Sequence, residues 1–194
     1  MKRIFAYLLT GVLLFSSGHA LAYTKTGNGL VTSIRLGAAK AIKLEVVNDN
    51  VIRVVASPTG DFKEEVNMIK DTRTLQVPAF TIEEKEGTII LATATTKAHI
   101  LKETGEVWFT DRQGNLILQE KRGGGKDFSP MEIEGTKGYT WHQVFENDDD
   151  EGLYGVGQHQ SDEFNYKGRN EELFQYNTKV SVPFILSTKG YGSL

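Results

Sequence analysis

The chain has 194 residues, no cysteine and a formal net charge of −3 at pH 7. The absence of cysteine excludes disulfides, thiol nucleophiles and cysteine-based metal sites. The mildly acidic balance makes nucleic acid and anionic membranes poor partners, whereas neutral partners fit without strain.

Residues 1–22 have the three-part pattern of a secretory signal peptide. The parts are a charged start at Lys2 and Arg3, an apolar run over 4–15, and small residues at Ala20 and Ala22. The apolar run is shorter than the roughly 20 residues of a membrane span, so a transmembrane segment is the weaker interpretation. We expect export to the periplasm or the extracellular space, with 23–194 as the mature chain. A chain of that size can form an ordinary core without disulfides.

Apolar and polar residues alternate over 41–56 on both sides of the polar residues 48–50, which predicts a β-hairpin. Further alternating runs cover 72–82, where Pro78 marks an edge position or a bulge, and 88–101. The apolar runs 107–109 and 116–118 flank a turn that contains glycine. Helical periodicity is limited to one short segment with Phe62, Val66 and Ile69. Strands at such short intervals predict an all-β sandwich or barrel.

Two polar stretches interrupt this pattern. The glycine-rich run 122–126 lacks the spacing of a phosphate-binding loop, so a flexible loop is the better interpretation. Residues 146–151 contain five carboxylates in six positions but lack the alternating ligands of a calcium loop. We therefore favour a solvated acidic loop over a calcium site, and we expect neither a metal nor a cofactor.

Several single residues allow a functional and a structural interpretation. His159 has no second metal ligand at a regular spacing, so a structural or surface histidine is favoured. Gly155 and Gly157 lack the third glycine of a dinucleotide loop and are better explained by a tight β turn. Trp108 and Trp141 are candidates for sugar-stacking platforms, but an aromatic residue beside Val107 and Phe109, as Trp108 is, lies more often in the sandwich core.

The end of the chain is unusual. Residues 180–186 read as an apolar strand, 190–192 read as a turn, and the chain stops at Leu194. Natural C-termini usually end in polar, poorly ordered residues. We therefore expect that the chain is cut from a longer polypeptide.

Three motifs in this region resemble a known family. They are Leu153-Tyr-Gly-Val-Gly-Gln158, Phe174-Gln-Tyr-Asn177, and Pro183-Phe184 followed by Ser187, Gly190, Tyr191 and Gly192. Together they resemble the N-terminal domain of glycoside hydrolase family 31, which contains α-glucosidases and α-xylosidases. The resemblance implies a galactose-mutarotase-like β-sandwich packed on a following (β/α)8 barrel, which supplies the catalytic aspartates. It implies no catalytic residue and no cofactor in this chain, with the barrel and an oligosaccharide substrate as partners.

In the family, a loop of this domain reaches over the mouth of the barrel and carries a Trp-Asn-Arg-Asp type run. The matching positions here are Phe174, Gln175, Tyr176 and Asn177, so an Arg-Asp charge pair is replaced by Tyr-Asn. Amides and aromatic rings can hydrogen-bond hydroxyls and stack on sugar faces. The candidate substrate-binding residues are Asn177, Gln158, His159, Gln175 and Tyr176. The alternative is that this segment is a polar connecting loop packed on a neighbouring domain.

Three hypotheses about function follow. The first is an N-terminal sandwich of an exported family 31 glycosidase, inactive by itself, with an α-xylosidase favoured over an α-glucosidase. The second is a free-standing carbohydrate-binding sandwich without hydrolase activity. The third is a mutarotase-like epimerase, which needs a histidine and a carboxylate together in the sandwich cleft; the candidate histidines are His99, His142 and His159.

Overall fold

The computed structural model describes residues 22–63, 76–158 and 163–194. Within these ranges the chain forms fifteen antiparallel β-strands and no helix. All but the last residue of the predicted signal peptide over 1–22, and most of the predicted short helix, lie outside the described residues. No helix in the described part of the chain is long and apolar enough to cross a membrane.

The first layer is a four-stranded sheet in the order β1-β2-β3-β4. Its strands are β1 (Thr24–Thr26), β2 (Gly29–Ser33), β3 (Ala41–Asn48) and β4 (Val51–Ser57). Strands β3 and β4 form the predicted hairpin, in which Asn48 pairs with Val51. The side chain of Asn48 accepts a hydrogen bond of 2.9 Å from the backbone N–H of Asn50. This local bond is the reason that Asn favours tight turns.

The second layer is a six-stranded sheet in the order β12-β9-β8-β7-β6-β5. Its strands are β5 (Thr81–Lys85), β6 (Thr88–Ala92), β7 (Thr96–Leu101), β8 (Val107–Asp111), β9 (Leu116–Glu120) and β12 (Phe145–Glu146). The run at 88–101 is two strands rather than one. The predicted strand over 72–82 is wrong for residues 76–80, because β5 begins only at Thr81.

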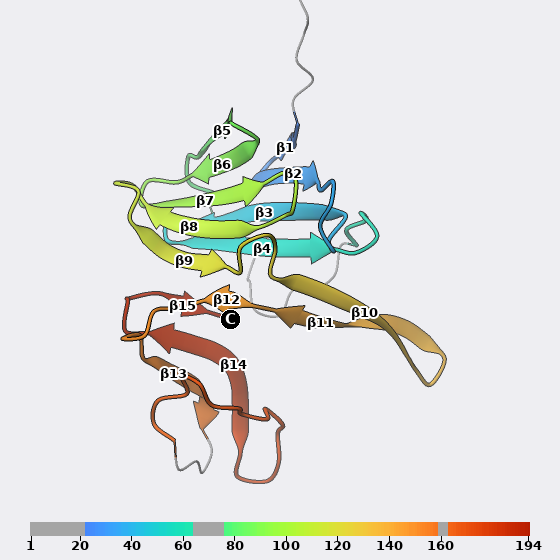
Figure 1. Cartoon of the computed structure of the whole chain (residues 1–194), viewed down its shortest axis with the longest axis vertical. Helices are drawn as coiled ribbons and strands as arrows, with labels where there is room; N and C mark the ends of the chain where they lie inside the picture. The colour runs from blue at the N-terminus through green and yellow to red at the C-terminus, as the bar shows by residue number, and fades with distance from the viewer. Residues whose placement is uncertain (1–21, 64–75, 159–162) are drawn as a thin grey trace, which may run out of the picture.

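The two sheets lie face to face, as Figure 1 shows, and enclose the hydrophobic core. Fully buried side chains come from both layers and are Leu30, Ile42 and Leu44 of the first sheet and Ile89, Leu91 and Ile100 of the second. Alternation along each strand places these residues on the inner face and polar residues on the outer face. The prediction of an all-β sandwich is thus confirmed, because two β-sheets enclose one hydrophobic core.

The rest of the chain lies outside this sandwich. Strands β10 (Lys126–Ile133) and β11 (Thr136–Gln143) form a two-stranded ribbon that projects from the body (Figure 1). Strands β13 (Leu153–Gln158), β14 (Val180–Ser187) and β15 (Gly192–Ser193) form a separate three-stranded sheet below the two layers. The segment with the candidate sugar-binding residues connects β13 to β14.

Candidate functional site

The structure brings the two ends of the candidate segment together. Gln158 is the last residue of β13 and pairs with Val180, the first residue of β14. Tyr176 and Lys179 form a bridge across a turn that contains Asn177, and this turn leads directly into β14. Gln158 and the turn at Asn177 therefore meet at the same end of the β13–β14 ladder. His159 lies outside the described residues.

The candidate residues on the turn are available to a ligand. Gln158, Gln175 and Asn177 are exposed, and Tyr176 is 66% exposed. Asn177 has a φ of 43°, a left-handed conformation that Asn adopts more readily than most residues. The turn therefore uses Asn for its backbone as well as presenting its amide.

Phe174 and Tyr176 form the aromatic part of this surface. Their ring centroids lie 6.5 Å apart at an interplanar angle of 47°. The Lys179 ammonium lies 4.9 Å from the Phe174 ring centroid, and the Ser181 hydroxyl donates a 2.9 Å hydrogen bond to the Phe174 carbonyl. These contacts hold an exposed aromatic pair beside exposed amides, a combination suited to sugar rings and their hydroxyls.

The glycines of the Leu153–Gln158 motif have a structural role that differs from the prediction. Gly155, Val156 and Gly157 all have positive φ, at 119°, 59° and 101°, and they form a bulge within β13 rather than a tight turn. A Cβ at Gly155 would collide with the Phe184 carbonyl, and one at Gly157 would collide with the Val180 carbonyl. Glycine therefore permits both the bulge and the close approach of β14.

A buried carboxylate joins the beginning of β13 to the end of β14. Glu151 is 3% exposed and accepts hydrogen bonds from the Ser187 hydroxyl at 2.5 Å and the Tyr191 hydroxyl at 2.6 Å. The prediction of a solvated acidic loop is therefore wrong for Glu151, although Asp148, Asp149 and Asp150 are exposed. No group of three or more potential metal ligands occurs among the described residues. Glu151 is a structural anchor for the sheet that carries the candidate segment.

Replacing Tyr191 with Phe should lower the free energy of unfolding by about 1–3 kcal/mol, because a buried carboxylate loses a donor. Burial and the bond to Glu151 raise the pKa of Tyr191 from 10.0 to about 12. A raised pKa means that this stabilisation is complete below pH 10 and is lost as the pH rises toward 12. Urea unfolding at pH 8 and pH 11 tests this, and an equal pH dependence in both proteins would contradict it.

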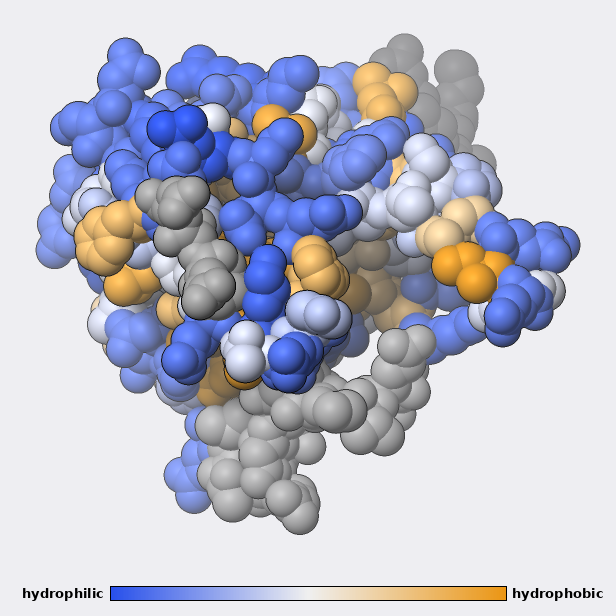
Figure 2. Space-filling model, turned by 90° about the horizontal axis from the view of Figure 1, so that it is seen from below, coloured by the Kyte–Doolittle hydropathy of each residue, from blue (hydrophilic) through white to orange (hydrophobic). Residues whose placement is uncertain are grey.

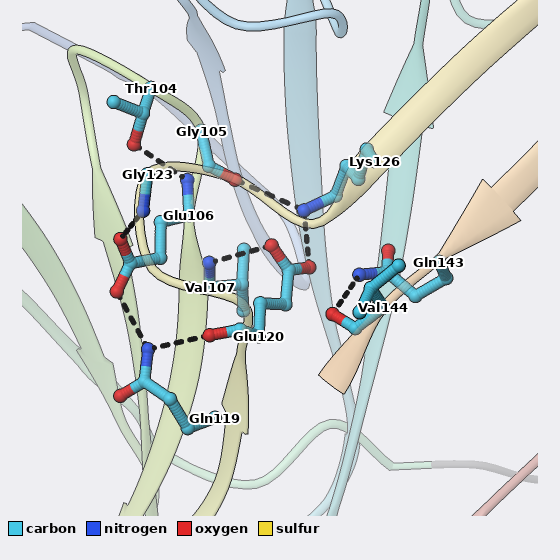
Figure 3. A network of polar contacts seen from close by, with 10 residues as sticks. All are labelled: Thr104, Gly105, Glu106, Val107, Gln119, Glu120, Gly123, Lys126, Gln143 and Val144. Carbon is cyan, nitrogen blue, oxygen red and sulfur yellow. Dashed lines mark hydrogen bonds and ion pairs between the residues drawn. The ribbon is translucent and has the colours of Figure 1, made fainter. Parts of the chain in front are cut away.

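A second buried polar cluster lies at the base of the β10–β11 ribbon (Figure 3). The carboxylate of Glu120 and the ammonium of Lys126 form an ion pair in which the side chains are 4% and 5% exposed. Glu120 also accepts a 3.1 Å bond from the Val107 N–H, and Lys126 donates a 3.0 Å bond to the Gly105 carbonyl. Burial raises the pKa of Glu120 and lowers that of Lys126. Each charged group is thus paired with the other and hydrogen-bonded to the backbone, which indicates a structural role for both residues.

The glycine-rich run 122–126 is part of the same cluster. The N–H of Gly123 donates a 2.8 Å bond to the Glu106 carboxylate, which also accepts a 2.6 Å bond from the Gln119 amide. The N–H of Gly124 donates to the Lys121 carbonyl at 3.0 Å. The run is therefore a hydrogen-bonded turn that positions Lys126.

The two candidate histidines that the structure describes, His99 and His142, do not form an epimerase site in the sandwich, and His159 lies outside the described residues. His99 stacks on Trp108 with ring centroids 4.9 Å apart, and its Nε2 lies 3.0 Å from the Thr110 hydroxyl. Burial lowers the pKa of His99 to about 4, so its ring is neutral at pH 7. The Nδ1 of His142 lies 3.9 Å from an Asp127 carboxylate oxygen, but both side chains are largely exposed on the ribbon.

The tryptophans also differ from the sequence-based expectation. Trp108 is half-buried and stacks on His99, and the core cluster does not include it. Trp141 is 57% exposed on the β10–β11 ribbon. The core interpretation is therefore wrong for Trp108.

Comparison with known proteins identifies the domain type. The model of the family described as "Glycosyl hydrolase 31 N-terminal galactose mutarotase-like domain" matches residues 41–194. An alpha-xylosidase from Saccharolobus solfataricus is 30% identical, with 79% of this chain and 22% of that protein covered. An uncharacterized family 31 glucosidase from Pseudescherichia vulneris is 27% identical, with 79% of this chain and 32% of that protein covered.

Solved structures agree with this assignment. The crystal structure of the family 31 α-xylosidase from Xanthomonas citri superposes with a TM-score of 0.79 and 37% identity. It is matched over 87% of this chain and 18% of its own length. A family 31 α-xylosidase from a soil metagenome, complexed with xylose, gives a TM-score of 0.64 and 25% identity, over 88% of this chain and 27% of its own length.

The chain thus spans about a third or less of the relatives that it matches. The all-β, galactose-mutarotase-like sandwich predicted from the sequence is confirmed. From the fold and from the family match over 41–194, the chain belongs to the glycosyl hydrolase 31 N-terminal galactose mutarotase-like domain family.

Proposed function

We propose that this chain is the non-catalytic N-terminal domain of a retaining α-glycosidase that packs on a following (β/α)8 barrel and lends the 158–179 segment to the sugar subsites. The observation that carries the proposal is the family match over 41–194, combined with relatives of which the chain covers only 32% and 22%. An α-xylosidase is favoured, because relatives at 30% and 37% identity bear that name. Residues 1–22 would direct the enzyme to the periplasm or beyond.

The catalytic carboxyl groups are assigned to the barrel. Retaining hydrolysis requires two carboxyl groups about 5 Å apart on either side of the scissile bond. The two buried carboxylates described above, Glu120 and Glu151, are bonded to Lys126 and to Ser187 and Tyr191 respectively. Neither is placed to attack a glycoside. The part of this domain in catalysis is therefore substrate positioning.

The proposal predicts that the 194-residue chain alone does not hydrolyse aryl α-xylosides or α-glucosides. Release of nitrophenol from the corresponding nitrophenyl glycosides measures this directly, with the full-length enzyme as the positive control. Hydrolysis by the chain alone would overturn the non-catalytic role. Binding of oligosaccharide by a chain whose reading frame has no barrel would support the alternative of a free-standing binding module.

A substitution in the full-length enzyme tests the role of the loop. Asn177→Gly deletes the amide but keeps a residue that tolerates the φ of 43°. Loss of one hydrogen bond to a sugar hydroxyl should lower kcat/KM by about 2–10-fold. The matched control is Gln113→Ala, which removes an exposed amide from the turn between β8 and β9. Equal activity of the two variants would show that the segment is only a connection.

A further inference from the structure

The central part of the β10–β11 ribbon carries ring side chains on one face. Two cross-strand pairs form this ring face, namely Phe128 with Trp141 and Pro130 with Tyr139. Successive side chains of a strand point to opposite faces, so the four rings lie together and the residues between them face the other way. Those residues form the polar pairs Asp127 with His142 and Ser129 with Thr140. The middle of the ribbon is therefore amphipathic, and its apolar side consists of rings.

Most of the ring face is open to solvent in the described part of the chain. Tyr139 is 46% exposed, Trp141 is 57% exposed, and Pro130 is exposed as well. Phe128 packs against the core of the sandwich, and its ring meets that of Tyr139 edge to face, with 6.4 Å between the centroids. The ribbon stands out from the body of the molecule at the right of Figure 2. Phe128 thus ties the ring face to the sandwich, while the other three rings face solvent.

A shallow hollow lies beside the outer rings. It has a volume of about 420 Å³, which is within the range of small-molecule sites, and it is lined by residues 130–132 and 137–139. The lining combines the rings of Pro130 and Tyr139 with the charged side chains of Glu132 and Lys137. Glu132 and Lys137 pair across the strands, and with respect to the described residues neither side chain makes an ion pair or a hydrogen bond. Rings and available hydrogen-bonding groups therefore line the same hollow.

This combination suits a sugar better than an ion or a hydrocarbon. A pyranose ring has an apolar face of C–H groups that packs on aromatic rings, and its hydroxyls both donate and accept hydrogen bonds. The Glu132 carboxylate can accept from a sugar hydroxyl, and the Lys137 ammonium can donate to one. Because the two groups have opposite charges, the hollow has no net attraction for a simple anion or cation. A neutral carbohydrate is therefore the ligand class that fits this surface.

The size of the ring face argues against a second copy of the chain as its occupant. The ring face exposes on the order of 300 Å², so two copies joined through it would bury about 600 Å² in total. Stable interfaces between separate chains bury about 1,200 Å² or more. Tyr139 and Trp141 lie about 7 Å apart along β11, so they can contact neighbouring rings of one sugar chain. The ring face is therefore large enough for a short stretch of polysaccharide and too small for a stable dimer.

We propose that the ring face of the β10–β11 ribbon binds a neutral polysaccharide chain, at a site separate from the 158–179 segment. The ribbon and that segment extend from the body in different directions (Figure 1). The choice of a polysaccharide rests on the proposed function, whereas the rings and the hollow are features of the ribbon itself. Binding at the ring face holds the enzyme on its polymer and raises the effective concentration of sugar residues near the catalytic domain.

The test measures binding of the 194-residue chain to xyloglucan, a glucan with α-xylosyl branches, by affinity electrophoresis. The polymer should retard the unaltered chain, and added salt should not reduce the retardation, because the ligand is neutral. Trp141→Ala should raise the dissociation constant about tenfold, since it removes an aromatic ring that stacks on the sugar. The urea midpoint of this variant should equal that of the unaltered chain, because Trp141 is exposed.

His142→Ala is the matched control. It removes a ring from the neighbouring position of the same strand but from the opposite face, so binding should be unchanged. Equal weakening by His142→Ala and Trp141→Ala would overturn the proposal. Retardation that Tyr176→Ala abolishes and Trp141→Ala leaves intact would place binding on the 158–179 segment instead. A dimer of the chain that Trp141→Ala dissociates would assign the ring face to a second copy.

Two further outcomes separate this proposal from the proposed function. Absence of retardation in a chain whose full-length product hydrolyses α-glycosides would overturn only the polysaccharide site on the ribbon. Binding that depends on Trp141, in a chain whose full-length product hydrolyses no α-glycoside, would refute only the proposed function.

Discussion

Replacing Lys126 with Met should lower the free energy of unfolding by about 3–5 kcal/mol. The substitution removes the ammonium and leaves the Glu120 carboxylate, 4% exposed, without its counter-charge (Figure 3). A buried carboxylate without a counter-charge is destabilised by its loss of hydration. The hydrogen bond from the Val107 N–H does not neutralise the negative charge of Glu120. Urea unfolding of the 194-residue chain, followed by circular dichroism at pH 7, measures the loss.

The double variant Glu120→Gln/Lys126→Met should recover at least half of that loss. A neutral amide can still accept from the Val107 N–H and no longer carries a charge into the interior. Arg35→Met serves as the control, because Arg35 and Glu103 form an exposed ion pair worth about 0–1 kcal/mol. Equal losses for Lys126→Met and Arg35→Met would show that burial does not govern the Glu120–Lys126 pair.

Leu91→Ala should also be strongly destabilising, by about 2–5 kcal/mol. Leu91 lies in β6, belongs to the core cluster between the two large sheets and is fully buried. Removal of the Leu91 side chain leaves a cavity, because the close-packed neighbours from the two sheets cannot fill it without distorting the pairing of the β-strands. The midpoint of urea unfolding should fall while the slope is unchanged, since the surface exposed on unfolding is nearly the same.

Leu116→Ala provides the comparison for this prediction. Leu116 is 59% exposed at the start of β9, so removing the same atoms should cost less than about 1 kcal/mol. Similar costs at Leu91 and Leu116 would indicate that the two sheets do not enclose the core described here.

Alternation in the sequence was sufficient to predict the β3–β4 hairpin, because the turn at Asn48 depends on contacts between neighbouring residues. It failed at 76–80, where a polar–apolar pattern was mistaken for a strand that begins only at Thr81. Alternation of apolar and polar residues shows which side chains share one face of a strand, but it does not show whether another layer covers that face. For this reason the core position expected for Trp108 is wrong, and the side chain is only half-buried.

The candidate site rests on the resemblance and on the amides and aromatic rings between Gln158 and Asn177, and sugar contact there stays a prediction. Proximity of Gln158 to the turn at Asn177 follows from the pairing of Gln158 with Val180, a contact between strands that local sequence does not encode. The burial of Glu151 escaped prediction for the same reason, since its partners Ser187 and Tyr191 are 36 and 40 positions away. The acidic residues that precede Glu151 in the sequence indicated an exposed loop, whereas Glu151 is buried.

The pairing of Gln158 with Val180 holds the two ends of the segment between them on adjacent strands. The segment is also tied to β13 from within, because the Tyr166 N–H donates a 2.8 Å bond to the Leu153 carbonyl and the Leu153 N–H donates a 2.9 Å bond to the Asn165 side chain. The glycine bulge of β13 and the Glu151 anchor of the sheet lie outside the segment. Under the proposed function, a grafted segment that keeps these two bonds would alter substrate selectivity while the scaffold stays intact.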